Sequence, residues 1–147
     1  MDVSTRADYD VGKVYYDQGL WDTAKACFSR AEALFTASNP IHSSTTAAQL
    51  KLACIAMKQG RLEDAIPMLR QTLLICKLLE DARGDRRETA RVMRRLAEAL
   101  DLAGQSAEAA QYKEEAESIR KELQGARFDE LGDTEQSYNM LMYVAFW

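Results

Sequence analysis

The 147-residue sequence has few of the residues that break helices, since it contains only seven glycines and two prolines. Alanine, leucine, glutamate, arginine and glutamine are plentiful, and these residues favour helix. The composition therefore argues against a β-sandwich or a β-barrel. Hydrophobic residues make up 47% of the chain and the formal net charge is only −4, which excludes a disordered chain. The length suits one domain with its own hydrophobic core.

Cysteine and histidine are also scarce, and so are the motifs of most enzymes. Cys27, Cys54 and Cys76 form no CxxC pair and lie in apolar helical runs, so we interpret them as small buried side chains. The only histidine, His42, lies in a predicted loop without the residue pattern of a catalytic triad or a zinc site. No glycine-rich phosphate-binding motif occurs. We therefore expect no cofactor and no metal ion.

Signals for secretion or membrane insertion are missing as well. The first ten residues, MDVSTRADYD, lack the basic and apolar parts of a signal peptide. The longest apolar run, MLMYVAFW at residues 140–147, is much shorter than the ~20 residues that span a bilayer. An acidic chain is not expected to bind nucleic acid or an anionic membrane surface. These observations predict a cytoplasmic protein.

The sequence does contain a short string that occurs three times: GLWDTA from Gly19, GRLEDA from Gly60 and GQSAEA from Gly104. In each string the glycine can end one helix in a left-handed conformation, and an acidic residue falls in the first turn of the next helix. Apolar residues on both sides recur at helical spacing. We predict helices at residues 5–18, 21–37, 43–59, 62–83, 86–103 and 106–124, with a local kink at Pro67.

This pattern resembles the tetratricopeptide repeat, in the longer variant found in kinesin-light-chain-like arrays. The resemblance covers about residues 5–124 and implies an all-α fold, an α–α superhelix (solenoid) of three helical hairpins plus a C-terminal helix. The repeats would span about residues 5–37, 43–83 and 86–124 of a single domain, residues 1–147. The positions that match the repeat pattern are Gly12, Tyr15, Gly19, Ala24, Phe28, Ala31, Ala53, Gly60, Ala65, Leu69, Ala97, Leu100, Gly104, Ala109 and Ala116.

The C-terminal segment, residues 133–147, does not fit a repeat. Asp133 and Gln136 are spaced as a capping box, which predicts a seventh helix over residues 134–146. This helix would be apolar on every face from residue 140 onward, and such a helix is buried on most sides. We expect it to cap the solenoid, to fill the groove, or to contact another chain and form a homodimer.

Six arginines lie within thirteen residues, with acidic residues between them. One interpretation is a helix surface covered by salt bridges, for example between Arg94 and Glu98, and another is a site that binds a carboxylate or another anion. A third, nucleic-acid binding, is disfavoured because the chain is acidic and no aromatic residues lie between the arginines. The arginines are Arg83, Arg86, Arg87, Arg91, Arg94 and Arg95.

The resemblance also implies which residues line a concave groove, since the first helix of each repeat faces inward there. Arg91 and Arg95 match two basic positions of the clamp with which some family members hold a peptide's carboxylate. The candidate binding residues are Tyr9, Lys13, Tyr16, Leu50, Cys54, Met57, Arg91, Arg94, Arg95 and Glu98.

Two functions follow as hypotheses. The first is a binding module whose groove takes a peptide or protein partner. The second is a cofactor-independent enzyme of the pericyclase or isomerase type, which would hold a hydrophobic, terpenoid-like small molecule in a groove closed by the C-terminal tail. In that case the catalytic hydrogen-bond donors would be Tyr9, Lys13, Tyr16 and Arg94.

Overall fold

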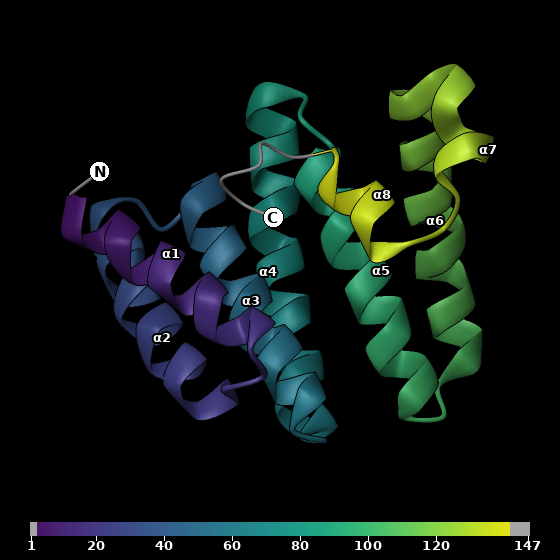
Figure 1. Cartoon of the computed structure of the whole chain (residues 1–147). Coiled ribbons are helices and arrows are strands. Elements are labelled where there is room, and N and C mark those ends of the chain that lie inside the picture. Colours follow the sequence, from purple (N-terminus) through teal and green to yellow (C-terminus); the bar gives the residue numbers. More distant parts are fainter. Residues whose placement is uncertain (1–2, 142–147) are drawn as a thin grey trace. The chain divides into compact units, whose positions relative to one another are not determined.

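The computed structural model describes residues 3–141, with side chains from residue 5 onward. Every regular element in this part of the chain is a helix, which confirms the all-α expectation (Figure 1). The six long helices agree with the predicted ranges to within two residues at each end. They are α1 (Val3–Asp17), α2 (Trp21–Ser38), α3 (Ser43–Lys58), α4 (Leu62–Arg83), α5 (Arg87–Leu102) and α6 (Ser106–Gln124).

The three repeated strings form the same turn. Gly19, Gly60 and Gly104 have φ values of 73°, 73° and 80°. In each case the next residue donates its backbone N–H to a carbonyl five residues back, as in Leu20 to Tyr15 and Gln105 to Leu100. This is the Schellman ending of a helix, in which glycine takes the left-handed position at no steric cost. The turns therefore place α2, α4 and α6 directly after their preceding helices.

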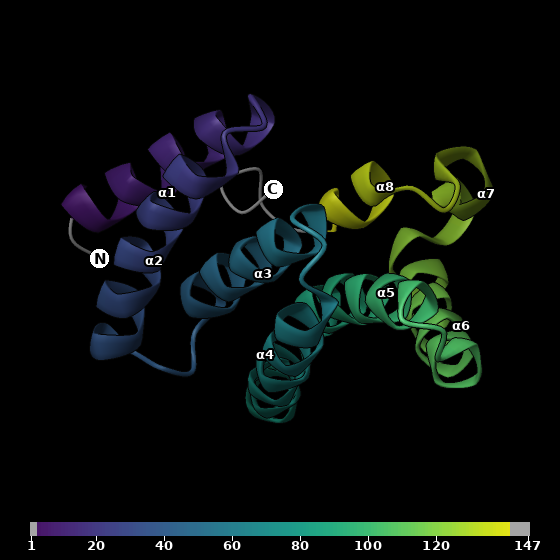
Figure 2. The same cartoon turned by 90° about the horizontal axis from the view of Figure 1, so that it is seen from below.

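The chain consists of two compact units, residues 1–75 and 76–147. In the first unit, α1 and α2 lie side by side (Figures 1 and 2). Tyr9 of α1 meets Phe28 edge to face, with 5.3 Å between ring centroids. Gly12 lies so close to the same ring that an added Cβ would come within 3.0 Å of it. The glycine therefore permits the close approach of the two helices. Further along this unit, Thr72 of α4 donates a hydrogen bond to Gln49 of α3 at 3.2 Å.

In the second unit, α5 packs along α6. The core between them contains small and branched side chains at helical spacing, which lets the helices approach closely. Its fully or almost fully buried members include Met93, Leu96, Leu100, Ala109, Ala116 and Ile119.

After α6 the chain forms the 3₁₀ turn η1 (Gly125–Arg127), α7 (Phe128–Leu131) and α8 (Glu135–Asn139). The predicted helix over 134–146 is wrong in its extent, because α8 ends at Asn139 and a turn follows at residues 140 and 141. The predicted capping box is also wrong, because Thr134 is the N-cap and accepts a hydrogen bond from the Ser137 N–H at 3.1 Å. The expected dimer contact and the burial of the apolar run beyond residue 141 lie outside the described residues.

The remaining sequence predictions about local structure have mixed outcomes. All three cysteines are buried and free, as predicted. Helix α4 continues through Pro67, and a kink there stays a prediction.

Candidate functional site

Three arginines of the predicted cluster lie on one side of α5, one helical turn apart. Arg91, Arg94 and Arg95 are related by spacings of three and four residues, which bring side chains together on a helix. We call these three residues the arginine face. Arg86 and Arg87 make other contacts: Arg86 pairs with Glu122 and Arg87 with Asp85, both at 2.7 Å.

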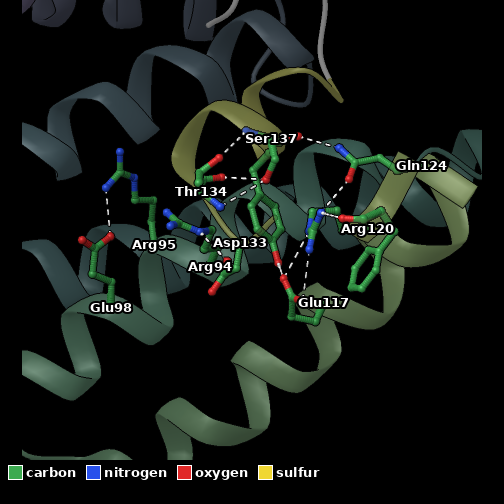
Figure 3. A network of polar contacts seen from close by, with 11 residues as sticks. Arg94, Arg95, Glu98, Glu117, Arg120, Gln124, Asp133, Thr134 and Ser137 are labelled. Carbon is green, nitrogen blue, oxygen red and sulfur yellow. Dashed lines mark hydrogen bonds and ion pairs between the residues drawn. The ribbon is translucent and has the colours of Figure 1, made fainter. Parts of the chain in front are cut away.

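Outside α5, the arginine face contacts residues 133–139, which we call the acidic segment. Within α5, Arg91 pairs with Glu88 at 3.4 Å and Arg95 with Glu98 at 2.9 Å. Nε of Arg94 donates to Oδ1 of Asp133 at 3.2 Å (Figure 3). Nε of Arg91 donates to Oδ1 of Asn139 at 3.0 Å, and Arg95 forms an ion pair with Glu135. Each arginine therefore contacts a different residue of the same seven-residue segment.

A second set of contacts holds the acidic segment from the side of α6 (Figure 3). The Tyr138 hydroxyl donates to Oε1 of Glu117 at 2.7 Å, and Nε of Arg120 donates to the same oxygen at 3.2 Å. Arg120 also donates to Gln124 at 2.7 Å, and Gln124 donates to the backbone carbonyl of Ser137 at 2.7 Å. This network connects α6 to both the side chain and the backbone of α8.

Tyr138 and Arg120 are almost completely buried, at 2% and 1% exposure. Their protonation state decides whether they can donate hydrogen bonds to Glu117. Burial raises the pKa of Tyr138, and the hydrogen bond to Glu117 raises it further. Burial acts in the opposite direction on Arg120, but the bonds to Glu117 outweigh it, so the pKa of Arg120 is raised as well. Both groups therefore keep their protons and act as donors to Glu117. The Arg94 guanidinium lies 5.3 Å from the centroid of the Tyr138 ring, within the range of a cation–π contact.

The arginine side chains are less exposed than the carboxylates that they contact in the acidic segment. The side chains of Arg91 and Arg95 are only 5% and 10% exposed and that of Arg94 is 23% exposed, whereas those of Asp133 and Glu135 are 40% and 50% exposed. The counter-ion of Arg91 is Glu88, whose side chain is 8% exposed. Ion pairs with exposed partners contribute roughly 0–1 kcal/mol. A buried charge left without its counter-ion is far more costly, about 3–5 kcal/mol. The arginines therefore require anionic or polar partners, while no single carboxylate of the acidic segment is held strongly.

A small cavity of about 190 Å³ adjoins the arginine face. Pockets for drug-sized ligands usually measure about 300–1,000 Å³, so this one has room for a side chain rather than a whole metabolite. Its lining comes from α5, α6 and the acidic segment: Arg94, Ala97, Glu98, Asp101, Lys113, Asp133 and Tyr138.

The predicted site residues other than the arginines and Glu98 lie in the first unit. Tyr9 is fully buried and packs against Phe28 and Phe35. Leu50 and Cys54 are buried, whereas Lys13, Tyr16 and Met57 are half-buried. Lys51 of α3 places its Nζ 4.5 Å from the centroid of the Tyr16 ring of α1. A shared role for these residues in one groove stays a prediction.

Sequence reasoning identified the arginines but missed the residues that they contact. It suggested that Arg94 pairs with Glu98, one turn along the helix. Instead Arg94 binds Asp133, and Glu98 accepts a hydrogen bond from Arg95 at 2.9 Å. The only signal of the distant partners was the complementary charge of Asp133 and Glu135 immediately after Gly132.

The described helices include none that is both long and apolar enough to span a lipid bilayer.

Comparisons with known proteins agree with this repeat structure. The family model of the tetratricopeptide repeat matches residues 4–77 and again residues 44–122. Among solved structures, similarity is found to the nearly identical tetratricopeptide-like repeats of a Podosopora anserina protein assigned as a kinesin light chain, and to a single-substitution variant of it. Each has 20% sequence identity and a TM-score of 0.72, and the match covers 95% of this chain and 64% of the other.

The match to the Podosopora anserina structures supports the fold alone, and this chain spans about 64% of their length. Among curated proteins, none matches significantly. Because the family model covers most of the chain, and because the helical pairs and their glycine turns have the predicted form, the fold expectation is confirmed. The chain belongs to the tetratricopeptide repeat family.

Proposed function

We propose that this protein is a binding module whose arginine face on α5 binds an acidic segment of a protein or peptide partner. Tetratricopeptide repeats generally mediate protein–protein interaction. The observation that supports this particular surface is that Arg91, Arg94 and Arg95 each contact a different residue of one short segment. A site that accepts one acidic segment has the charge and spacing to accept another.

The chemistry of arginine suits this role. Its planar guanidinium group remains charged and offers several N–H donors, which fit carboxylates well and also stack on aromatic rings. Arginine and tyrosine are enriched among the residues that contribute most to protein interfaces. At the Arg94–Tyr138 contact, an arginine guanidinium lies over a tyrosine ring, so both of these residue types meet at one position. Electrostatic attraction would also speed association and make it sensitive to salt.

Other predicted residues remain part of this proposal. Lys13, Tyr16 and Met57 of the first unit are half-buried and are candidates for contact with a partner. The cytoplasmic location inferred from the sequence likewise remains proposed.

The test is fluorescence anisotropy with a fluorescein-labelled peptide, Asp-Thr-Glu-Gln-Ser-Tyr-Asn, at low ionic strength and with the full chain. All proteins carry Asp133→Asn and Glu135→Gln, so that the chain's own segment competes less for the arginine face. On this background we expect saturable binding that weakens about tenfold or more when Arg94→Ala or Arg95→Ala is added, because each removes a charged contact. Arg127→Ala is the matched control, since Arg127 is exposed and lies outside the arginine face. Binding that is equal in all variants, or the absence of binding at low salt and millimolar protein, would contradict the proposal.

A further inference from the structure

We propose that a cavity at the N-terminal end of α3 binds a small phosphate monoester, with the phosphate at the helix end and the ester group on an apolar wall. The cavity lies within the first unit, so the proposal is independent of the arginine face. Its volume is about 260 Å³, somewhat below the roughly 300–1,000 Å³ of sites for drug-sized ligands. The polar residues that line it come from α1, α2, α3 and the loop before α3: Thr5, Ser38, Asn39, His42, Ser44 and Thr45.

A buried hydroxyl in the cavity wall makes no hydrogen bond. Ser44 lines the cavity and is only 2% exposed, and its Oγ has no partner in the part of the chain that the structure describes. The hydroxyls of Thr45 and Thr46, in the same helical turn, donate to the carbonyls of Asn39 and Ser43 at 2.8 and 3.0 Å. A buried hydroxyl without a partner is unfavourable. The Ser44 hydroxyl is therefore a group that a ligand in the cavity can satisfy.

Two other polar side chains of the wall use their acceptor atoms within the protein and keep their donors. Nδ1 of His42 accepts the backbone N–H of Ser44 at 3.0 Å. A neutral imidazole that accepts through Nδ1 carries its proton on Nε2, which is then a donor. Oδ1 of Asn39 accepts the N–H of Ile41 at 3.1 Å, so its NH₂ group is what remains for a ligand. Such a wall favours a ligand rich in acceptor atoms.

The charge around the cavity favours an anion over a neutral acceptor. Helix α3 has 16 residues, and the N-terminus of such a helix carries a partial positive charge that attracts phosphates and carboxylates. Among the described residues that line the cavity, none is acidic and none is lysine or arginine. Binding would therefore rely on hydroxyl, amide and imidazole donors. A phosphate group offers three strong acceptor oxygens to such donors, one more than a carboxylate.

The apolar part of the cavity indicates what the phosphate is attached to. Leu34 and Phe35 of α2 form this wall, and Leu34 is 47% exposed. Inorganic phosphate would leave the wall in contact with water, whereas the carbon atoms of an ester would cover it. The volume suffices for both parts, since a water molecule occupies only about 30 Å³ of liquid. An ester should therefore bind more tightly than inorganic phosphate.

The experiment titrates the ¹⁵N-labelled full chain with phenyl phosphate, inorganic phosphate and phenol at constant ionic strength, and follows the amide signals by NMR. We expect saturable shifts at residues 38–46 with phenyl phosphate, and binding at least about fivefold weaker with inorganic phosphate, which does not cover the apolar wall. Equal binding of these two ligands would overturn the assignment of an ester. Phenol that binds as tightly as phenyl phosphate would overturn the assignment of an anion. If about 20 mM phenyl phosphate gives no saturable shifts at residues 38–46, the whole proposal fails.

Variants in the first turn of α3 distinguish a ligand site from a structural role. Ser44→Ala removes a hydroxyl that is unpaired in the free protein, so thermal stability should stay equal or rise, while phenyl phosphate binds about tenfold more weakly. Ser43→Ala is the matched control and should bind like the wild type, because Ser43 is the neighbouring serine and does not line the cavity. If Ser44→Ala also binds like the wild type, the site is wrong.

A substitution at His42 tests the anion itself. His42 is the N-cap of α3, and aspartate is also a good N-cap, so His42→Asp should keep the fold. Its carboxylate would place a negative charge at the cavity, so we expect phenyl phosphate binding to be lost. Thermal unfolding without ligand establishes that the variant is folded. A folded His42→Asp protein that binds phenyl phosphate as tightly as the wild type would overturn the proposal.

Discussion

The hydroxyl of Tyr138 donates a hydrogen bond to Oε1 of Glu117 at 2.7 Å, and this bond joins α8 to α6. Glu117 also accepts hydrogen bonds from Arg120, whose side chain is almost completely buried. The acidic segment is thus held on one side by a buried network and on the other by half-exposed ion pairs. This asymmetry suggests that the two sides contribute differently to stability and to recognition.

Removal of the Tyr138 hydroxyl should destabilise the protein. A hydrogen bond to a charged acceptor contributes about 1.5–3 kcal/mol. We expect Tyr138→Phe to lower the free energy of unfolding by about 1.5–2 kcal/mol, the lower part of this range, because Glu117 keeps its bonds to Arg120. Urea denaturation measures the change. Tyr112→Phe is the control, because Tyr112 has no hydrogen bond in the described part of the chain and should lose less than about 0.5 kcal/mol. Equal effects of the two substitutions would show that the 2.7 Å bond does not contribute.

Gly12→Ala should destabilise the first unit even though alanine favours helix. The added Cβ would lie 3.0–3.1 Å from three atoms of the Phe28 ring, so the ring must move within a filled core. Overpacking of this kind costs about 1–3 kcal/mol, which exceeds the roughly 1 kcal/mol that alanine gains over glycine in a helix. Thermal unfolding of Gly12→Ala should occur below that of the wild type. Val14→Ala is the control, because Val14 is exposed on the same helix and its substitution should change stability little. A Gly12→Ala protein more stable than the wild type would refute the close packing of α1 on α2.

Stability should fall at alkaline pH because of Cys76. Burial raises the pKa of this thiol, and the nearby charge of Glu88 raises it further. In the unfolded chain the thiol loses its proton above about pH 8.5, whereas in the folded chain it keeps the proton. The unfolded state then binds fewer protons, so the free energy of unfolding decreases as pH rises above about 8.5, by up to about 1.4 kcal/mol per pH unit. Denaturation of wild type and Cys76→Ser between pH 7 and 10 measures this contribution. We expect the difference in free energy of unfolding between wild type and Cys76→Ser to shrink as pH rises. A difference that stays constant from pH 7 to pH 10 would contradict this prediction.

The repeat region could be predicted closely because its signals are local. Gly19, Gly60 and Gly104 each require a left-handed turn, and the apolar spacing on either side requires helices, so the ends of six helices followed from neighbouring residues. The C-terminal helix was less predictable. Asp133 and Gln136 have the spacing of a capping box, but Asp133 binds Arg94 instead, and Thr134 takes the cap position.

The candidate site could be predicted only in part, for a related reason. The arginines were visible as a cluster, and Arg91, Arg94 and Arg95 share a helix face at known spacings. Their partners in the acidic segment lie 39 to 48 residues away in sequence, and a rule for neighbours on one helix does not predict contacts at that separation. That rule paired Arg94 with Glu98, whereas tertiary packing brings Asp133 to Arg94 and leaves Glu98 to Arg95.

The most direct test of the central claim is a titration of the uniformly ¹⁵N-labelled full chain with the peptide Asp-Thr-Glu-Gln-Ser-Tyr-Asn, followed by amide NMR. The claim is that an acidic segment of a partner binds the arginine face of α5. On a chain that carries Asp133→Asn and Glu135→Gln, it predicts saturable, salt-sensitive shifts concentrated at residues 91–98 and 133–139, and their loss when Arg94→Ala is added. Shifts confined to residues 5–75, or identical shifts with and without Arg94→Ala on this background, would contradict it.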